Sequence, residues 1–364
     1  DIGAALKPGE QNETIDARGC LLIPGFVDIH ADSLEAAIAP RPAAPFEPSS
    51  VLPSYDAELA MHGITTVFHC VGLAEIGDLS KSLRTRDMAL KIISAIREFA
   101  PRALLRTKIH LRYEITDTES LPLLEELIDG KLVDLVSIMD HTPGFGVFKD
   151  LEAYRNYYLR SGQSVEAADR KFSELLSRRK KVDEDALKRV VRKCLQQGLT
   201  VVSHDDHTAE KLQWALDLGV SIAEFPVTLE AVDFSRKNGM KTVFGTPNLI
   251  RGISHAGNLR AADMVASNRA DILCLDYSPR CSLPALFKAA KLNGNQLSDA
   301  CRMFAQTPAH SVGLGKCSGA IEVGRQADMV LVEEDGRIPR VLATFVAGTP
   351  VYQTISSTRT TQGA

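Results

Sequence analysis

Residues 107–115 read Thr-Lys-Ile-His-Leu-Arg-Tyr-Glu-Ile, and the spacing of their polar side chains decides the fold class. Side chains alternate between the two faces of a strand, so one face of this segment is apolar and the other is ionisable. The alternative, an edge strand with a hydrated polar face, is disfavoured because parallel strands flanked by helices rarely expose a face. Inside a closed barrel, ionisable groups persist when they are paired, hydrated or bound to ions. The segment therefore predicts a barrel strand that turns four ionisable side chains inward: Lys108, His110, Arg112 and Glu114.

This segment is one of eight short apolar runs, each followed by a stretch with helical spacing. Strands that alternate with helices in this way predict a parallel sheet, and eight of them predict closure into a (β/α)8 TIM-type barrel. The alternative, an open doubly wound sheet, would be expected to show a GxGxxG turn, and none follows any of the runs. The runs cover residues 26–29, 65–70, 107–115, 133–139, 200–203, 220–225, 241–244 and 271–275. The predicted helices cover residues 56–62, 83–99, 119–129, 184–197, 209–218, 229–238, 259–267 and 283–292.

Both ends of the chain depart from this pattern. Residues 1–23 and 314–355 alternate apolar and polar side chains between glycines, which is typical of short antiparallel strands. They predict a small β-sandwich domain beside a barrel that covers residues 24–313. The small polar residues 356–364 predict a disordered tail.

An insertion at residues 142–183 follows the fourth predicted strand. Its polar sequence, rich in tyrosine, arginine and lysine, contains two stretches with helical character, 151–160 and 165–181. Because it follows the carboxyl end of a barrel strand, it lies on the catalytic side. We expect either a lid over the active site or an additional helical pair that covers the barrel rim.

Composition narrows the class of function. The 364 residues carry a formal net charge of -4 and no basic tract, so nucleic acid is not expected as a partner. The seven cysteines include no CxxC pair, which favours a reducing cytoplasm over a disulfide framework or a structural zinc knuckle. No apolar run reaches the roughly 18 residues that span a bilayer, and no secretory apolar segment stands at the N-terminus. No membrane partner is therefore predicted.

Candidate metal ligands stand at the ends of the predicted strands, where the active sites of such barrels are built. His30 and Asp32 share a face of the first strand, and imidazole nitrogen with carboxylate oxygen suits zinc, manganese or iron. A His-x-Asp pair also occurs by chance, so other strands must support it. Support comes from residues 203–207 (Ser-His-Asp-Asp-His), from Glu224 in an apolar setting and from Asp276 at the end of the eighth strand. A helix cap would explain one member of the 203–207 cluster, and the others need a different reason.

The loop after the seventh predicted strand is rich in hydrogen-bond donors. Residues 245–258 contain Arg251, Ser254, His255 and Asn258 among several glycines. Barrels of this class often bind phosphate in the loops after strands seven and eight. The alternative is an ordinary polar surface loop. Together with Arg112 on the third strand, these donors suit an anionic substrate.

Two segments resemble the amidohydrolase superfamily: Pro24-Gly-Phe-Val-Asp-Ile-His30 and Gly319-x-Ile-x-x-Gly324-x-x-Ala327-Asp328. Most members carry His-x-His on the first strand, whereas this chain has His30-Ala31-Asp32. That departure is similar to one branch, the diphosphatases that act on α-D-ribose 1-methylphosphonate 5-triphosphate in phosphonate utilisation. The matching stretches lie in the expected order from about residue 20 to about residue 350. They include residues 30–35, 40–42, 63–68, 139–144, 203–206, 223–226, 247–252, 254–255 and 276–277.

The resemblance implies a metal-bearing barrel with a small β-sandwich made from both chain ends. It also implies hydrolysis of a triphosphate to a 5-phosphate with release of pyrophosphate, in a small phosphorylated sugar substrate. One or two divalent metal ions are implied, with zinc favoured over manganese or iron, and homo-oligomers are common in the superfamily. Asp276 is the expected catalytic residue, which would hold the attacking water and accept its proton.

The superfamily pattern, carried onto this chain, implies the following metal ligands: His30, Asp32, Glu114, His204 and Glu224. The usual ligand on the sixth strand is a histidine, so Glu224 is a second departure from the pattern. The residues expected to bind substrate are Arg41, Arg112, His207, Arg251, His255 and Asn258.

Three other functions compete with this one. The same kind of metal site could hydrolyse a C–N bond, as in a deacetylase or a cyclic amidase, which predicts fewer phosphate donors in the pocket. A diphosphatase acting on another nucleotide or sugar phosphate is the second alternative. The third, a non-catalytic barrel that serves as a scaffold, predicts lost ligands, whereas the carboxylates required at the strand ends are all present.

Overall fold

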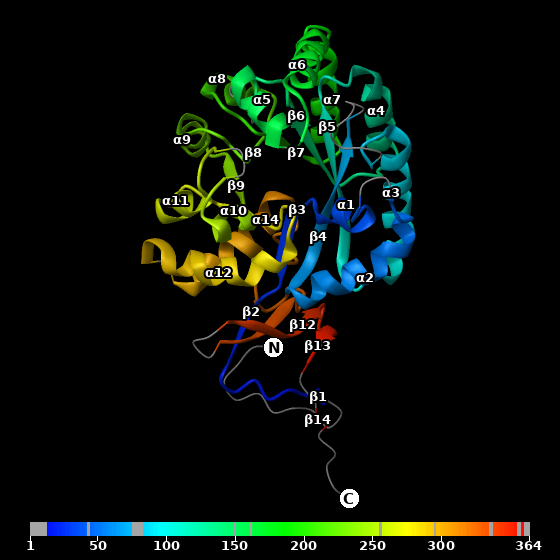
Figure 1. Cartoon of the computed structure of the whole chain (residues 1–364). Helices are drawn as coiled ribbons and strands as arrows, with labels where there is room; N and C mark the ends of the chain where they lie inside the picture. The colour runs from blue at the N-terminus through cyan, green and yellow to red at the C-terminus, as the bar shows by residue number, and fades with distance from the viewer. Residues whose placement is uncertain are drawn as a thin grey trace, which may run out of the picture.

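The computed structural model describes residues 13–41, 44–74, 83–146, 148, 150–160, 162–254, 257–294, 296–334, 338–354 and 358–359. Its centre is an eight-stranded parallel sheet curled into a barrel, with helices around the outside and a small antiparallel sheet at one end (Figure 1). Each predicted strand is present, which confirms the TIM-type fold class. The barrel strands are β3 (Phe26–Ala31), β4 (Ile64–Leu73), β5 (Arg106–Glu114), β6 (Leu135–Met139), β7 (Thr200–His204), β8 (Ile222–Glu224), β9 (Lys241–Gly245) and β10 (Ile272–Cys274).

The outer helices pack one apolar face against the barrel. In α7 (Glu184–Gln196), Leu187, Val190, Val191 and Cys194 are buried, at the spacing of one helical face, and Asp183 caps the helix. The other helices are α1 (Ser33–Ile38), α2 (Pro48–Met61), α3 (Arg86–Phe99), α4 (Leu121–Asp129), α5 (Leu151–Arg160), α6 (Val165–Arg179), α8 (Ala209–Asp217), α9 (Leu229–Lys237), α10 (Thr246–Arg251), α11 (Ala261–Ala266), α12 (Ser282–Lys291), α13 (Leu297–Cys301) and α14 (Thr307–Ser311).

The barrel closes between β3 and β10, next to the predicted ligands. Neighbouring strands pair in order from β3 round to β10, and a β-bridge just beyond β10 joins the first strand to the last. The Asp32 N–H donates to the carbonyl of Asp276 (2.8 Å), and the Asp276 N–H donates to the carbonyl of His30 (2.9 Å). The buried carboxylate of Asp28 joins the same two strands, because it accepts from the N–H groups of His30 (2.9 Å) and Leu275 (2.5 Å). The seam of the barrel is therefore also the base of the predicted site.

The barrel interior is filled by a buried apolar cluster, called the apolar plug below. All barrel strands except β5 contribute to it, and β5 places the buried His110 inside the barrel instead. Three of its members stand two residues before a predicted site residue, so the plug lies directly beneath the site. The plug consists of Ile29, Phe68, Leu135, Val202, Ile222, Val243, Ile272 and Cys274.

A small antiparallel sheet is built from both ends of the chain, as predicted. Its strands lie in the order β13 (Thr349–Gln353), β12 (Arg340–Val346), β11 (Met329–Glu333) and β2 (Cys20–Pro24). Asp328 connects this sheet to the barrel, since both of its oxygens accept from the Arg106 guanidinium at the start of β5, at 2.6 and 2.9 Å. This ion pair explains why the sequence carries an aspartate before the last strands.

Part of the predicted disordered tail forms a strand. Thr358–Arg359 form β14, which pairs antiparallel with β1 (Glu13–Thr14), so the prediction is wrong at these two residues. The other residues of the range 356–364 lie outside the described residues.

The helices of the insertion were predicted closely, whereas two other segments differ from the prediction. Helix α5 covers residues 151–160 as predicted, and α6 ends two residues early. Helix α2 begins at Pro48, well before residue 56, because proline is favoured in the first turn of a helix. The donor-rich loop after β9 contains the short helix α10, which has Pro247 in its first turn and is followed by Gly252 in the left-handed conformation (φ 76°).

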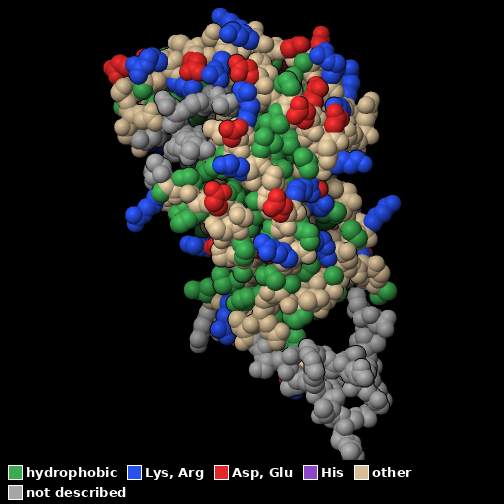
Figure 2. Space-filling model, turned by 90° about the vertical axis from the view of Figure 1, so that its right-hand side faces the viewer, with side chains coloured by type: hydrophobic (Ala, Val, Ile, Leu, Met, Phe, Trp, Pro, Cys, Tyr) green, Lys and Arg blue, Asp and Glu red, His purple; other side chains and the backbone are tan. Residues whose placement is uncertain are grey.

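The surface carries charges of both signs. Figure 2 shows Lys and Arg side chains interspersed with Asp and Glu over one face of the molecule, while hydrophobic side chains gather toward the end that carries the small sheet. Among the described helices, none combines the length and the apolar character needed to cross a bilayer.

Candidate metal centre and active site

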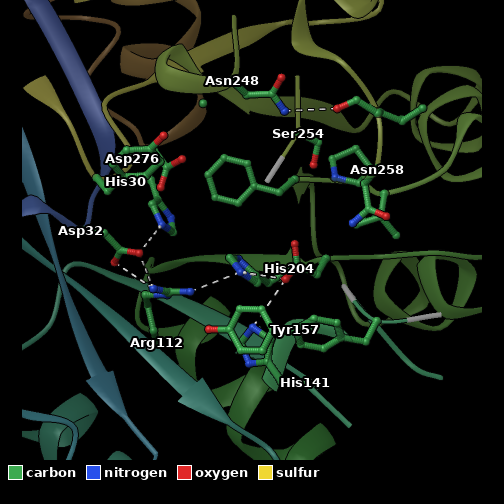
Figure 3. Close-up of a pocket in the computed structure, with 18 of the residues that line it drawn as sticks. His30, Asp32, Arg112, His141, Tyr157, His204, Asn248, Ser254, Asn258 and Asp276 are labelled. Carbon is green, nitrogen blue, oxygen red and sulfur yellow. Dashed lines mark hydrogen bonds and ion pairs between the residues drawn. The ribbon is translucent and has the colours of Figure 1, made fainter. Parts of the chain in front are cut away.

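A cavity of about 470 Å³ opens at the carboxyl ends of the barrel strands (Figure 3). Its wall brings together residues from strands and loops that are far apart in the sequence. Glu224 lies beneath the cavity and is fully buried. The predicted site residues that line the wall are His30, Asp32, Arg112, Glu114, His204, Arg251, Asn258 and Asp276.

The backbone turns sharply where three strands reach the cavity. Asp205 follows β7, Phe225 follows β8 and Asp276 lies just beyond β10, with φ angles of 52°, 53° and 55°. This left-handed region is uncommon for residues other than glycine, and each such residue costs of order 1 kcal/mol or more. At the cavity, these turns direct the side chains of Asp205 and Asp276 into the site.

Glu224 connects two histidines at the base of the site. Its Oε1 lies 2.7 Å from Nδ1 of His30, and its Oε2 lies 2.6 Å from Nδ1 of His204. Ser137 donates to Oε2 (3.1 Å), and His110 contacts Ser137 in turn. Burial alone would raise the pKa of Glu224, but the surrounding imidazoles hold it well below its usual value. The site therefore rests on a charged carboxylate surrounded by histidines.

Arg112 joins the two sides of the site. Its Nη1 donates to both oxygens of Asp32 (2.8 and 2.7 Å), and its Nη2 lies 3.3 Å from Nε2 of His204. Burial opposes ionisation of Asp32, yet the Arg112 guanidinium keeps the pKa of that carboxyl well below its usual range. Asp276 is in a different electrostatic situation, since burial raises its pKa to about 7. The two carboxyl groups thus differ in their affinity for protons.

Two further site residues, His141 and Asp205, were not among the predicted site residues. His141 Nδ1 lies 2.7 Å from Glu114 Oε2, and His141 Nε2 lies 3.4 Å from Asp205 Oδ2, which is 3.5 Å from Nε2 of His204. Burial alone would lower the pKa of His141, but the two carboxylates raise it to about 9. Their positions in the sequence could have indicated both residues, because His141 closely follows the end of β6 and Asp205 directly follows the end of β7.

The side chains at the cavity fit divalent metal ions. Four groups of described residues have ligand atoms within 4.8 Å of one another, and one of them, His30 with Cys70 and His110, includes two residues that do not line the cavity. The three groups at the cavity are His30 with His204 and Glu224, His141 with His204 and Asp205, and His30 with Asp32 and Asp276. His30 and His204 are each shared between two of these three groups, so the three groups are contiguous. Imidazole and carboxylate ligands suit zinc, manganese or iron.

The bonding of His30 supports this fit. Its side chain is fully buried, and within the described structure neither ring nitrogen makes an aligned hydrogen bond. Nδ1 is paired with Glu224 at 2.7 Å, whereas Nε2 lies 3.6 Å from Asp32 Oδ2. Because buried polar atoms are nearly always satisfied, Nε2 calls for a further ligand. Glu224 belongs to one group, and its role as a ligand stays a prediction. Glu114 contacts His141 and completes none of the three groups, and its role as a ligand stays a prediction.

Two of the predicted substrate-binding residues, Arg41 and His207, do not line the cavity. Arg41 is exposed and lies outside the cavity wall, because helix α1 carries the chain away after Asp32. His207 is half-buried and is not among the residues that line the cavity, since the turn at Asp205 redirects the chain. The structure therefore does not bring Arg41 and His207 to the site. His255 lies outside the described residues.

The loop after β9 forms the wall opposite Asp32 and Arg112, as Figure 3 shows for Asn248, Ser254 and Asn258. Asn248 anchors this wall, because its amide donates to the carbonyl of Leu259 (3.1 Å) and its oxygen accepts from the N–H of Ala261 (3.0 Å). Arg251 and Asn258 also line the cavity, and their role in binding substrate stays a prediction.

The insertion also contributes to the cavity. Helix α5 supplies Tyr157, and α6 supplies Lys171 to the wall. The sequence indicated a tyrosine-rich insertion on the catalytic side, but it could not indicate which tyrosines face the site. An ion pair of 2.7 Å between Arg179 at the end of α6 and the buried Asp140 after β6 holds the insertion in place. The insertion residues on the wall are Phe148, Tyr154, Tyr157, Tyr158, Lys171 and Leu175.

The chain is similar in sequence to a protein of known function. The chain is 35% identical over 324 residues to the alpha-D-ribose 1-methylphosphonate 5-triphosphate diphosphatase of Escherichia coli (strain K12), covering 88% of this chain and 85% of that protein. No protein-family model matches the chain.

Solved structures share the fold at low sequence identity. They include N-acetylglucosamine-6-phosphate deacetylase from Pasteurella multocida (TM-score 0.58, 14% identity, 92% of this chain and 88% of that chain). A D-hydantoinase is similar as well (TM-score 0.57, 12% identity, 93% and 86%), as is a Xaa-Pro dipeptidase (TM-score 0.59, 15% identity, 93% and 88%). These similarities support the fold alone. The chain belongs to the family of the α-D-ribose 1-methylphosphonate 5-triphosphate diphosphatase.

Proposed function

We propose that the protein hydrolyses α-D-ribose 1-methylphosphonate 5-triphosphate to the corresponding 5-phosphate and pyrophosphate. The proposal is based on the neighbouring groups of histidine and carboxylate side chains at the cavity. The cavity also has cationic donors on two sides, Arg112 on one and Arg251 on the other. A substrate with a phosphonate at one end and a triphosphate at the other suits this distribution of charge. The name of the Escherichia coli relative supports the same substrate.

Divalent ions would be held by the three groups of ligands around His30 and His204. When bound, such ions supply positive charge that polarises phosphoryl oxygens and makes a water more acidic. We assign Asp32 and Asp276 to the group around His30, and His141 and Asp205 to the group around His204. Glu224 lies between the two histidines and fixes their relative position.

Asp276 is the residue best suited to accept a proton from the attacking water. Burial raises its pKa to about 7, and a general base is most effective when its pKa lies near the working pH. In the reaction, the water oxygen bonds to phosphorus, the P–O bond between the α- and β-phosphates breaks, and the proton of the water passes to Asp276. Gly245 on β9 leaves room for this carboxylate, because a Cβ there would lie 2.7 Å from Asp276 Oδ2.

The insertion would shield the reaction from bulk water. Its aromatic side chains, Tyr157 among them, cover one side of the cavity, and exclusion of water strengthens the electrostatic interactions inside. Helix α6 is anchored by the Arg179–Asp140 ion pair, so this wall stays close to the barrel rim.

A direct assay tests the proposed function. Purified protein is stripped of metal with a chelator and then supplied in turn with zinc, manganese or ferrous iron in the presence of the sugar triphosphate. We expect pyrophosphate and the 5-phosphate in equal amounts, no turnover after stripping, and recovery with at least one of the metals. Hydantoin and an N-acetylated amino sugar serve as C–N substrates for comparison. Turnover of an amide without release of pyrophosphate would contradict the proposal and support hydrolysis of a C–N bond.

A further inference from the structure

We propose that Arg84 binds the pyrophosphate portion of the substrate at the wall of the cavity next to Asp32. Arg84 was not identified from the sequence, and none of the metal-ligand groups contains it. The identity of the anion rests on the proposed function, whereas the binding of an anion by Arg84 can be tested without turnover.

Arg84 is held so that part of its guanidinium is available. It lines the cavity, and its Nε and Nη2 donate to the carboxylate of Glu35, at 3.0 and 2.9 Å to the same oxygen. The hydrogen bonds of Arg84 to described residues use Nε and Nη2 and leave Nη1 without a partner among those residues, and the side chain is 31% exposed. Glu35 lies in α1, which begins directly after Asp32. One side of the guanidinium is therefore fixed by the protein, and the other is open to a ligand.

Gly72 on β4 provides the space that Arg84 occupies. A Cβ at this position would lie 3.1 Å from both Cγ and Cδ of Arg84, which is closer than an ordinary van der Waals contact. The aliphatic part of the arginine thus passes over a strand position without a side chain. Together with the Glu35 contact, this packing sets the direction of the guanidinium before a ligand binds.

The position of Arg84 relative to the candidate metal ligands indicates which part of the substrate it binds. Arg84 contacts Glu35 in the helix that begins directly after Asp32, Arg112 contacts Asp32 itself, and all three of Arg84, Arg112 and Asp32 line the cavity, so they share one side of it. Arg112 already directs Nη1 to Asp32 and Nη2 to His204, whereas Arg84 offers Nη1. A guanidinium beside the candidate ligands lies near the phosphate bond that is broken, and the pyrophosphate portion concentrates its charge on two adjacent phosphate groups, whereas the other product divides its charge between the two ends of a sugar. The wall with Arg251 and Asn258, across the cavity, is then left for the sugar end.

Calorimetric titration of the metal-loaded protein with pyrophosphate, and separately with ribose 5-phosphate, tests the proposal. The variants are Arg84→Gln, Arg84→Lys and the control Arg97→Gln. Arg97 is matched to Arg84 because it is also 31% exposed and also makes a 2.9 Å ion pair, with Asp134, but it does not line the cavity.

We expect Arg84→Gln to weaken pyrophosphate binding about tenfold to hundredfold, as loss of a charge-assisted hydrogen bond does, and to change ribose 5-phosphate binding less than twofold. Arg84→Lys keeps the charge without the fork and should give an intermediate loss, while Arg97→Gln should match the wild type. Unchanged pyrophosphate binding in Arg84→Gln, or a larger loss for ribose 5-phosphate than for pyrophosphate, would overturn the proposal. If the variants behave as expected in a protein that fails to hydrolyse the sugar triphosphate, the anion site stands and the proposed function falls.

Discussion

The apolar plug and the metal-ligand groups occupy successive layers of one barrel, yet they are held together by different forces. Val202, Ile222 and Cys274 in the plug stand two residues before His204, Glu224 and Asp276. In the plug, close packing of apolar side chains is sufficient, and each member contributes roughly in proportion to the area that it buries. In the layer above, each group depends on the charge and orientation of its neighbours.

The difference shows most clearly on β8. Ile222 touches other apolar side chains and can be exchanged for a similar shape at small cost, whereas Glu224 contacts two histidines and Ser137 through its two oxygens. A change in the upper layer therefore leaves several buried polar groups without partners. We expect mutations in the upper layer to affect catalysis and metal binding, and mutations in the plug to affect the free energy of unfolding.

The largest effect is expected for Asp276→Asn. The asparagine keeps the shape of the side chain but cannot accept the proton of the attacking water. We expect kcat to fall by about 10²- to 10⁴-fold, the usual contribution of general base catalysis. Steady-state assays of pyrophosphate release, with the metal content of the variant measured in parallel, test this. Wild-type turnover with metal still bound would show that Asp276 is not the base.

The next largest effect is expected for Glu224→Gln. An amide has the size of the carboxylate but not its charge, so His30 and His204 lose the group that both contact. We expect the affinity for divalent metal to fall about 10- to 100-fold, as is typical when a partner of metal-binding histidines is changed, and more if Glu224 is itself a ligand. Competition with a chelating dye measures this affinity. An unchanged metal affinity would mean that the buried carboxylate acts on neither histidine.

A smaller effect is expected for Gly245→Ala. Gly245 has a φ of -79°, which any residue adopts, so alanine introduces no backbone strain. Its Cβ would lie 2.7 Å from Asp276 Oδ2 and must displace that carboxylate. We expect kcat to fall about tenfold, because small misplacements of a reacting group are costly. In the Asp276→Asn background the same change should add little, and full additivity in this double-mutant cycle would separate Gly245 from Asp276.

The fold could be predicted from the sequence to a large extent, because local patterns determine it. The alternation on residues 107–115 indicated an interior ionisable face. His110, Arg112 and Glu114 are indeed buried, whereas Lys108 is partly exposed and pairs with Asp134. Strand ends were less accurate, and the helix α10 was missed because a short helix in a glycine-rich loop has little apolar periodicity. Its proline and glycine were nevertheless the correct signals for its two ends.

The candidate site could be predicted only in part, because it depends on contacts between distant segments. His30, Asp32, His204 and Asp276 follow from their positions at strand ends. Arg41 was misplaced, since its proximity in sequence to Asp32 does not reveal that α1 turns the chain away. The cavity wall made by the insertion and the role of Gly72 beside Arg84 arise from tertiary packing, which leaves no periodic signal in the sequence.

The smallest effect, and the sharpest contrast with Glu224, is expected for Ile222→Val. This change removes one methyl group from the apolar plug on the same strand, two residues before Glu224. We expect a loss of about 0.5–1.5 kcal/mol in the free energy of unfolding, which denaturant titration measures, with kcat and metal affinity within twofold of the wild type. A marked loss of metal affinity in this variant would show that the two layers are mechanically coupled. The apolar plug and the metal-ligand groups would then not be independent, because the position of Glu224 would depend on how tightly the plug beneath it is packed.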